Sequence, residues 1–424
     1  MGKEVKEKPA RAIVAAAQLP GVSDVELDAS VTELRELAKT LGFEVVGTFT
    51  QKRDNFDTTA YLGVGKRLEM RRFVENEPGL ERGPDSPPDP GGVRRAAKSG
   101  AARAKEAVQS AADPDTRRAD IVLVDHEISP SQARNLEIEV GCEVMDRTMV
   151  ILEIFHRHAR SRAARAQVEI ARLGYMAPRL REAAKLAGPK GRQRSGVGGR
   201  GAGEAHSELD RQKIRNRIAE LQQEIAAMDV ERKTQRARRQ ERQGLARVAL
   251  VGYTNAGKST LMRALTGSEV LVADKLFATL DTTVRALHPA SVPRVLVSDT
   301  VGFIKNLPHD LVASFKSTLE EAVEASLLIH VIDASDPGFE RQLAVTDEVL
   351  QEIGAQVVPR IRVFNKIDCV GDAAAQAARE AALRLQYPAC MVMSARREGD
   401  VAKLHAAIGA FFQRGLVEAE LFLP

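Results

Sequence analysis

A phosphate-binding loop constrains the fold of this chain more than any other feature. Residues 252–259 read Gly-Tyr-Thr-Asn-Ala-Gly-Lys-Ser and follow an apolar stretch, 247–251, that predicts a strand. Glycines at 252 and 257 let backbone N–H groups curl around a phosphate without side-chain clashes. Lys258 can neutralise phosphate oxygens, and the Ser259 hydroxyl can bind Mg²⁺. The segment therefore predicts a strand, a loop and a helix that hold a nucleotide.

A second motif supplies the choice of base. Asn365-Lys366-Ile367-Asp368 follows a predicted strand at 360–364. A carboxylate at position 368 can accept two hydrogen bonds from the N1–H and 2-amino groups of guanine, whereas adenine offers no such pair. The two motifs on one fold indicate that GTP is the substrate.

Three shorter motifs complete the pattern. Asp299-Thr300-Val301-Gly302 closes a predicted strand, so Asp299 can hold Mg²⁺ through water and the Gly302 N–H can reach the γ-phosphate. In 277–281, Thr279 would reach Mg²⁺ once triphosphate is bound. Ser394-Ala395 follows the strand at 389–393 and can contact the base edge. Strands separated by helices predict a doubly wound, mainly parallel sheet with its ligand at the strand carboxyl ends.

These motifs define the expected site. Lys258, Thr279 and Gly302 are the expected catalytic residues, and Ser259 and Thr279 the expected metal ligands. The expected nucleotide-binding residues are Gly252, Tyr253, Thr254, Asn255, Ala256, Gly257, Lys258, Ser259, Phe277, Ala278, Thr279, Leu280, Asp281, Asp299, Thr300, Val301, Gly302, Asn365, Lys366, Ile367, Asp368, Ser394, Ala395 and Arg396.

Two positions modify the expected mechanism. Phe303 follows Gly302, where many such enzymes carry a glutamine that orients water. We therefore expect slow intrinsic hydrolysis that a partner or a cation accelerates, although a distant glutamine swinging in is an alternative. Asn255 lies inside the phosphate loop, where its amide oxygen can help bind a monovalent cation such as K⁺. A bracing role within the loop explains Asn255 equally well.

Composition and charge narrow the setting. The apolar runs are too short to span a membrane, and the charged start of the chain lacks the apolar run of a signal peptide. The three cysteines have neither disulfide nor metal-ligand spacing, so a cytoplasmic protein is expected. Residues 151–245 hold 22 Lys and Arg against 11 Asp and Glu, a net charge of +11, although the whole chain carries only +4. A basic middle segment indicates a phosphate-rich partner, and a solvated helical surface is the alternative.

The chain divides into three expected domains. Residues 1–150 alternate strand-like and helical patterns, which predicts a small parallel α/β domain. Within it, 77–118 is rich in Pro, Gly, Ala and charge and predicts a disordered insertion. Residues 151–245 predict a helical linker that contains a glycine-rich loop at 188–203. Residues 246–424 predict a Ras-like domain of the phosphate-loop class.

The linker shows two helical patterns. Arginines at 157, 160, 162, 165 and 172 predict one long basic helix that ends near Met176-Ala177-Pro178. After the glycine-rich loop, apolar residues repeat at 4-3-4-3 spacing and predict the seam of a helical hairpin or short coiled coil, formed by Ile214, Ile218, Leu221, Ile225 and Met228.

The chain resembles the HflX family of bacterial GTPases. The resemblance rests on the phosphate loop, on Leu-Phe-Ala-Thr-Leu-Asp and Asp-Thr-Val-Gly-Phe, and on N-terminal motifs such as Val-Val-Gly-Thr-Phe-Thr-Gln-Lys-Arg-Asp at 45–54 and Ser-Pro-Ser-Gln-Ala-Arg-Asn-Leu-Glu at 129–137. It covers nearly the whole chain apart from 77–118. It implies an α/β N-terminal domain, a helical linker and a Ras-like GTPase domain. It also implies binding to the large ribosomal subunit and its RNA, and the splitting or rescue of stalled or idle ribosomes.

Two other functions remain open. The chain can be an RNA-remodelling enzyme whose N-terminal domain binds a second nucleotide, with Gly63 and Gly65 near the phosphates. It can also be a GTP-dependent switch that regulates a protein partner without touching RNA, although the basic middle segment disfavours that. In each case a monomer is expected.

Overall fold

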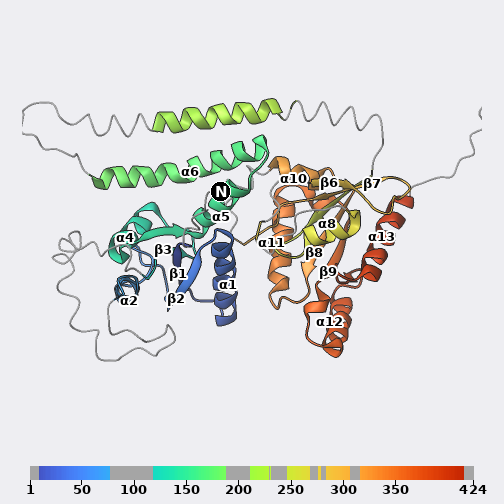
Figure 1. Cartoon of the computed structure of the whole chain (residues 1–424), viewed down its shortest axis with the longest axis horizontal. Helices are drawn as coiled ribbons and strands as arrows, with labels where there is room; N and C mark the ends of the chain where they lie inside the picture. Colours follow the sequence, from blue (N-terminus) through green and yellow to red (C-terminus); the bar gives the residue numbers. More distant parts are fainter. Residues whose placement is uncertain are drawn as a thin grey trace, which may run out of the picture. The chain divides into compact units, whose positions relative to one another are not determined.

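The computed structural model describes residues 9–76, 118–187, 211–228, 230, 246–267, 276–277, 283–305 and 316–414. They belong to two compact units, Met1–Ile154 with Arg172–Arg215 and Phe155–Ala171 with Asn216–Pro424 (Figure 1). The expected insertion (except Arg118), the glycine-rich loop and residues 278–281 lie outside the described residues. Within the described ranges, no helix is both long and apolar enough to cross a membrane.

The first unit contains a four-stranded parallel sheet, which confirms the expected α/β class. Its strands are β1 (Arg11–Gln18), β2 (Glu44–Lys52), β3 (Ile121–Val124) and β4 (Glu143–Asp146). Their order is β2-β1-β3-β4, and every pairing is parallel. The two inner strands, β1 and β3, are almost entirely buried, as expected for strands covered on both faces.

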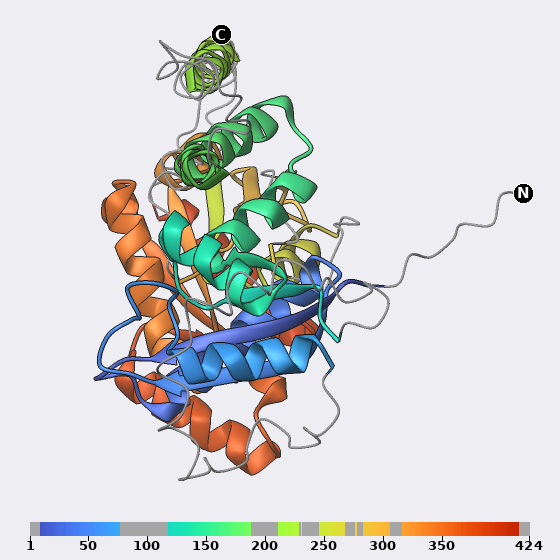
Figure 2. The same cartoon turned by 90° about the vertical axis from the view of Figure 1, so that its left-hand side faces the viewer.

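Helices cover both faces of this sheet. The helix α1 (Asp24–Thr40) lies on one side, and α2 (Val64–Val74) and α4 (Pro130–Val140) lie together on the other (Figures 1 and 2). Capping boxes begin α1 at Ser23 and α4 at Ser129, where the serine hydroxyl accepts a backbone N–H and a side chain three residues on returns a bond.

The expected long basic helix is two helices. The helix α5 (Arg147–His158) ends before Ala159, and α6 (Arg162–Ala187) begins after Ser161, whose Oγ accepts a hydrogen bond from Ala164 N at 3.1 Å. The serine cap therefore starts a new helix within the arginine-rich pattern. The expected end near Pro178 is also wrong, because α6 continues through this proline.

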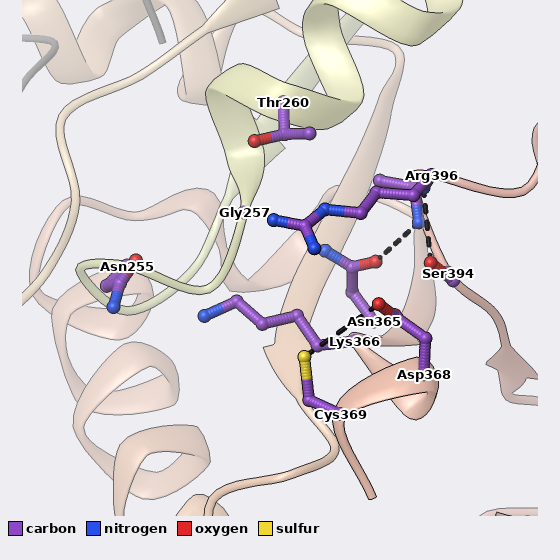
Figure 3. A pocket seen from close by; sticks show the side chains of 10 residues that line it. Asn255, Gly257, Thr260, Asn365, Lys366, Asp368, Cys369, Ser394 and Arg396 are labelled. Atoms are coloured by element: carbon purple, nitrogen blue, oxygen red, sulfur yellow. Dashed lines mark hydrogen bonds between the residues drawn. The ribbon is translucent and has the colours of Figure 1, made fainter. Parts of the chain in front are cut away.

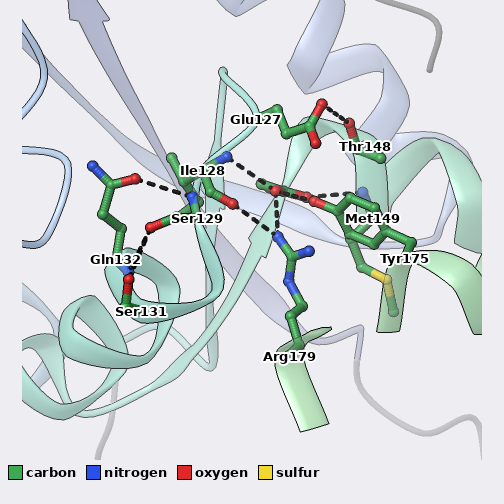
Figure 4. Close-up of polar contacts among 10 residues, drawn as sticks. Glu127, Ile128, Ser129, Ser131, Gln132, Thr148, Met149, Tyr175 and Arg179 are labelled. Atoms are coloured by element: carbon green, nitrogen blue, oxygen red, sulfur yellow. Dashed lines mark hydrogen bonds and ion pairs between the residues drawn. The ribbon is translucent and has the colours of Figure 1, made fainter. Parts of the chain in front are cut away.

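Contacts made by two side chains of α6 explain why the helix continues past its proline. The buried carboxylate of Asp146 accepts hydrogen bonds from Met149 N at 2.9 Å, from Arg179 at 2.6 Å and from the Tyr175 hydroxyl (Figure 4). The Arg179 guanidinium also lies 3.9 Å from the centre of the Tyr175 ring. These contacts hold the helical turns on both sides of Pro178. They offset the loss of the backbone hydrogen bond that a proline cannot make.

Residues 211–228 form a helix with the expected apolar seam. Leu221 is buried, and the other four seam residues are partly buried. Two ion pairs join this helix to α6, Arg162 with Glu224 at 3.3 Å and Arg217 with Glu169 at 3.0 Å. Because the earlier residue on α6 pairs with the later residue on its partner, the two helices run antiparallel. The expected helical hairpin is therefore present.

The second unit is the expected doubly wound Ras-like domain. Its six-stranded sheet has the order β10-β9-β8-β5-β7-β6, with only the β6–β7 pairing antiparallel. The strands are β5 (Ala246–Val251), β6 (Thr283–Ala286), β7 (Val295–Asp299), β8 (Leu327–Asp333), β9 (Arg360–Asn365) and β10 (Met391–Val392). The helices are α8 (Lys258–Thr266), α10 (Lys316–Val323), α11 (Phe339–Glu352), α12 (Ala373–Gln386) and α13 (Glu398–Gln413).

The layers of this unit place the motifs at one edge of the sheet. The helices α8 and α13 cover one face, and α10 and α11 the other (Figure 1). The phosphate loop follows β5, Asp299 ends β7 and Asn365 ends β9. Because parallel strands end at the same edge, residues far apart in the sequence converge there.

Candidate nucleotide-binding site

Two glycines of the phosphate loop occupy positions where no other residue fits. At Gly252 φ is +146°, and an added Cβ would lie 2.2 Å from the Val331 carbonyl oxygen. At Gly257 φ is +95°, and an added Cβ would lie 2.3 Å from Asn365 Nδ2. Both separations are far below van der Waals contact. The loop therefore packs against β8 and the base motif through bare backbone.

Lys258 and Ser259 begin helix α8 beneath this loop. The Lys258 ammonium is buried and donates to the carbonyl oxygens of Gly252 at 3.0 Å and Tyr253 at 2.8 Å. Burial lowers its pKa to about 8, although the attraction of Asp299 acts in the opposite direction. The Ser259 hydroxyl donates to Asp299 Oδ2 at 2.7 Å. A hydroxyl beside a carboxylate is an oxygen donor set that suits Mg²⁺ completed by phosphate oxygens and water.

A pocket of about 270 Å³ lies beside the loop and contains the base motif. Figure 3 shows Lys366 extending toward Asn255, and Arg396 extending over the pocket toward Gly257. The residues that line it are Asn255, Gly257, Thr260, Asn365, Lys366, Asp368, Cys369, Ser394, Ala395 and Arg396.

Asn365 connects three motifs that are distant in the sequence. Its Nδ2 donates to the Ala256 carbonyl at 3.0 Å, and its Oδ1 accepts from Ala395 N at 2.9 Å. The phosphate loop, the base motif and the Ser-Ala motif are therefore held at fixed separations. This arrangement presents a base and its phosphates with one rigid surface.

The Asp368 carboxylate is held in its charged form. Partial burial alone would raise its pKa, but hydrogen bonding by Ser394, a backbone N–H and the charges of Arg396 and Arg397 outweigh burial and lower it. An ionised carboxylate accepts hydrogen bonds and donates none. The pocket therefore presents an acceptor that suits the N1–H and 2-amino donors of guanine.

The segment after Asp299 lies directly on the phosphate loop. Phe303 N donates to the Gly252 carbonyl at 3.1 Å, and Thr254 N donates to the Phe303 carbonyl at 2.7 Å. Lys305 N donates to the Tyr253 hydroxyl at 2.8 Å. The Phe303 side chain is buried, so it contributes no polar group to the site.

Some expected site residues face elsewhere. The Thr300 hydroxyl donates to the Leu250 carbonyl at 2.6 Å and so braces β5, while Val301 and Ile367 are buried. Thr260 and Cys369 line the pocket although no motif singled them out. Thr260 directly follows Ser259, and Cys369 directly follows Asp368. Their position next to expected nucleotide-binding residues is the sequence feature from which they could have been predicted.

The N-terminal motif at 63–66 has fewer free backbone groups for binding a nucleotide than the phosphate loop would require. Gly63 precedes α2, and its N–H already donates to the Gln51 side chain at 2.8 Å. A Cβ at Gly63 would lie 2.5 Å from the Arg53 guanidinium, whereas one at Gly65 would meet nothing within 4 Å. The close approach at Gly63 is therefore explained by protein side chains.

Comparison with known proteins identifies relatives over nearly the full length. A family described as "50S ribosome-binding GTPase" matches residues 247–366, "GTP-binding GTPase Middle Region" matches 158–239, and "GTP-binding GTPase N-terminal" matches 28–80 and 93–156. The GTPase HflX of Gluconacetobacter diazotrophicus is 52% identical over 99% of this chain and 89% of its own length. That of Caldanaerobacter subterraneus is 42% identical over 86% of this chain and 74% of its own length.

Among solved structures, a GTP-binding protein of Sulfolobus solfataricus in complex with GDP aligns with 94% of this chain and 99% of its own, at 20% identity and a TM-score of 0.46. The three family matches and the similarity to HflX proteins over nearly the full length of the chain agree with the phosphate loop and the base pocket described above. The chain belongs to the HflX family of GTPases, enzymes that hydrolyse GTP.

Proposed function

We propose that this GTPase binds the large ribosomal subunit and, in its GTP-bound form, splits or rescues stalled or idle ribosomes. The proposal rests on the presence of a GTPase site and the basic segment 151–245 in one chain. Hydrolysis of GTP does not require such a basic segment, so we infer that the segment binds a phosphate-rich partner. The family description of a 50S ribosome-binding GTPase supports the choice of partner. The protein would act as a monomer in the cytoplasm.

Hydrolysis would proceed by in-line attack of water on the γ-phosphorus. The new P–O bond forms as the bond to the β–γ bridging oxygen breaks, GDP leaves with that electron pair, and the protons of the water remain with the phosphate product. Lys258 would turn from the loop carbonyls to the β and γ oxygens, and the Gly302 N–H would donate to the γ-phosphate. Mg²⁺ held by Ser259, by Asp299 through water and by Thr279 would neutralise the phosphate charge.

Slow intrinsic turnover follows from Phe303. Because its side chain is buried and apolar, it cannot orient the attacking water. Large ribosomal subunits would supply the missing acceleration. Free protein should therefore hydrolyse GTP slowly and large subunits should increase the rate, as measured by phosphate release.

Asn255 would help bind K⁺ between the phosphates. It is exposed at the edge of the pocket with φ of +57°, and its side chain makes no hydrogen bond within the described residues (Figure 3). This favours a ligand role over a bracing role. Replacing K⁺ with Na⁺ should slow hydrolysis by the unaltered protein but not by Asn255→Ala.

Ribosome binding would use the exposed arginines where α5 ends and α6 begins. Four arginines are exposed there: Arg157, Arg160, Arg162 and Arg165. Arg162 pairs with Glu224, and Arg165 donates to the Ala159 carbonyl. Changing the four to alanine should weaken co-sedimentation with large subunits and reduce its dependence on salt, because fewer phosphate counterions are released. GTP affinity should be unchanged.

A matched control removes four exposed basic residues that lie outside the segment 151–245: Arg263, Arg341, Arg384 and Lys403. Sedimentation in GDP and in a non-hydrolysable GTP analogue tests the proposal directly, and density gradients of intact ribosomes test splitting. Equal ribosome affinity of the two quadruple variants would contradict the assignment of this surface.

A further inference from the structure

The hydroxyl of Thr254 is buried without a hydrogen-bond partner. The residue is 6% exposed, and its Oγ1 bonds to no other atom among the described residues. Its backbone N–H is satisfied by the Phe303 carbonyl at 2.7 Å. The backbone N–H of Thr254 is therefore hydrogen-bonded, whereas its side-chain oxygen is not bonded to any described residue.

Other buried hydroxyls described in the second unit are bonded. Ser298 donates to the Val248 carbonyl at 3.2 Å, and Thr300 and Thr266 likewise donate to backbone carbonyls. Removing a hydroxyl from water without a replacement bond is unfavourable, and proteins rarely leave one in that condition. A buried hydroxyl without a protein partner is expected where a ligand supplies the acceptor.

The position of Thr254 identifies that ligand. A Cβ built on Gly302 would lie 2.9 Å from both Cα and Cγ2 of Thr254 and 3.0 Å from Lys258 Nζ. The Thr254 side chain, the Gly302 backbone and the Lys258 ammonium therefore meet at one point. In the proposed function, Gly302 and Lys258 are the groups that contact the terminal phosphate of GTP, so an acceptor oxygen would arrive between them.

We propose that the Thr254 hydroxyl donates a hydrogen bond to a γ-phosphate oxygen and so distinguishes GTP from GDP. The proposal rests on the placement of the phosphates given above. GDP has no oxygen at this position, so the hydroxyl would gain no acceptor when GDP is bound. Entry of the γ-phosphate requires residues 302–303 to move off the loop, which breaks the bond from Thr254 N to the Phe303 carbonyl. One residue thereby couples detection of the third phosphate to release of residues 302–303 from the phosphate loop.

Two substitutions separate the hydroxyl from the rest of the side chain. Thr254→Val keeps the shape and removes the hydroxyl, whereas Thr254→Ser keeps the hydroxyl and removes the methyl group. Affinities of the full-length protein for GDP and for a non-hydrolysable GTP analogue are measured by calorimetric titration. Thr254→Val should weaken binding of the analogue by about tenfold to a hundredfold, the effect of losing a hydrogen bond to a charged group. Its GDP affinity should change by no more than about twofold, and Thr254→Ser should bind both nucleotides like the parent.

The opposite pattern would overturn the proposal. A purely structural role predicts that Thr254→Val loses affinity for GDP and for the analogue equally, or for neither. Thermal unfolding of each variant with GDP identifies a folding defect, in which case Thr254→Ala and Thr254→Ser are compared in the same way. If the unaltered protein bound GDP but not the analogue, the phosphate assignment of the proposed function would fail instead.

Discussion

The ring of Phe277 packs against the ring of Phe155, with centroids 4.6 Å apart and planes inclined by 57°. Both side chains are buried. Phe277 lies two residues before Thr279, which is proposed to reach Mg²⁺, and Phe155 lies on α5. Phe277 also has φ of +57°, a conformation that bulky residues rarely adopt without support from their surroundings. The aromatic contact therefore anchors Phe277 in this conformation.

Replacing Phe155 with leucine should loosen this anchor. Leucine keeps most of the apolar volume, so the free energy of unfolding should fall by no more than about 1.5 kcal/mol. Because Leu276 and Phe277 would be held less firmly, trypsin should cleave more rapidly after the neighbouring Lys275. The control is Phe339→Leu, which alters a different aromatic pair, Phe339 with Phe364. Equal cleavage rates in the two variants would show that Phe155 does not anchor Phe277.

Gly257→Ala should abolish tight nucleotide binding. The added Cβ would lie 2.3 Å from Asn365 Nδ2, and φ of +95° is strained for alanine. Backbone strain alone costs about 1–3 kcal/mol, and displacement of Asn365 would also disturb Ala256 and Ala395. Thermal unfolding and GDP titration check this. Gly399→Ala is the control, since a Cβ there meets nothing within 4 Å, and it should behave like the parent.

Asp368→Asn should exchange guanine for xanthine. The substitution replaces an acceptor by a donor opposite the 2-position of the base, where xanthine carries an oxygen. Leaving buried polar groups unpaired costs discrimination of roughly 10⁴ between substrates. Competition between GDP and XDP for the variant measures the ratio. Undiminished preference for GDP would refute the base assignment.

Nucleotide affinity should fall as pH rises above about 8. Burial lowers the pKa of Lys258 to about 8 in the structure, and phosphates bind only the charged ammonium. Below this pH both states hold the proton and affinity is constant. Above it the protein must take up a proton on binding, so the dissociation constant rises by up to about tenfold per pH unit. In Lys258→Arg, whose guanidinium stays charged, this rise between pH 7 and 9 should disappear.

Acid should destabilise the second unit through His330. Burial on β8 lowers its pKa to about 4, with Asp347 opposing the shift. The unfolded chain takes up this proton near the ordinary value of 6.5, before the folded chain does. Stability is therefore fully present above pH 6.5 and falls toward pH 4, by up to about 1.4 kcal/mol per pH unit. Urea unfolding at pH 7 and 5 should show a smaller loss for His330→Leu than for the control His405→Gln.

The local motifs could be predicted because each depends on neighbouring residues. Gly252, Gly257 and Lys258 form a loop through their own backbone freedom and charge, and Asp368 is defined by its place after a buried strand. Apolar runs likewise predicted β5, β7 and β9 and a mainly parallel sheet in the second unit. These features need little information from elsewhere in the chain.

Secondary structure was predicted wrongly where the local sequence pattern was weak or where one pattern masked another. The edge strand β6 is partly exposed and carries only four residues, so it shows no apolar run. The arginine pattern obscured the serine cap at Ser161 and suggested one helix in place of two. Pro178 suggested a helix end, although distant contacts to Asp146 hold the helix together.

Only the tertiary structure decides which distant residues meet. The amide of Asn365 reaches Ala256, 109 positions away, and the ring of Phe277 reaches Phe155. The packing also places the Thr254 side chain against Gly302 and buries its hydroxyl without a partner among the described residues. Such contacts arise from the packing of strands and helices around one core, and a hydroxyl on a loop carries no sequence pattern that records whether it will be satisfied. The sequence by itself therefore determined the chemistry of GTP binding, and the fold determined how its parts are coupled.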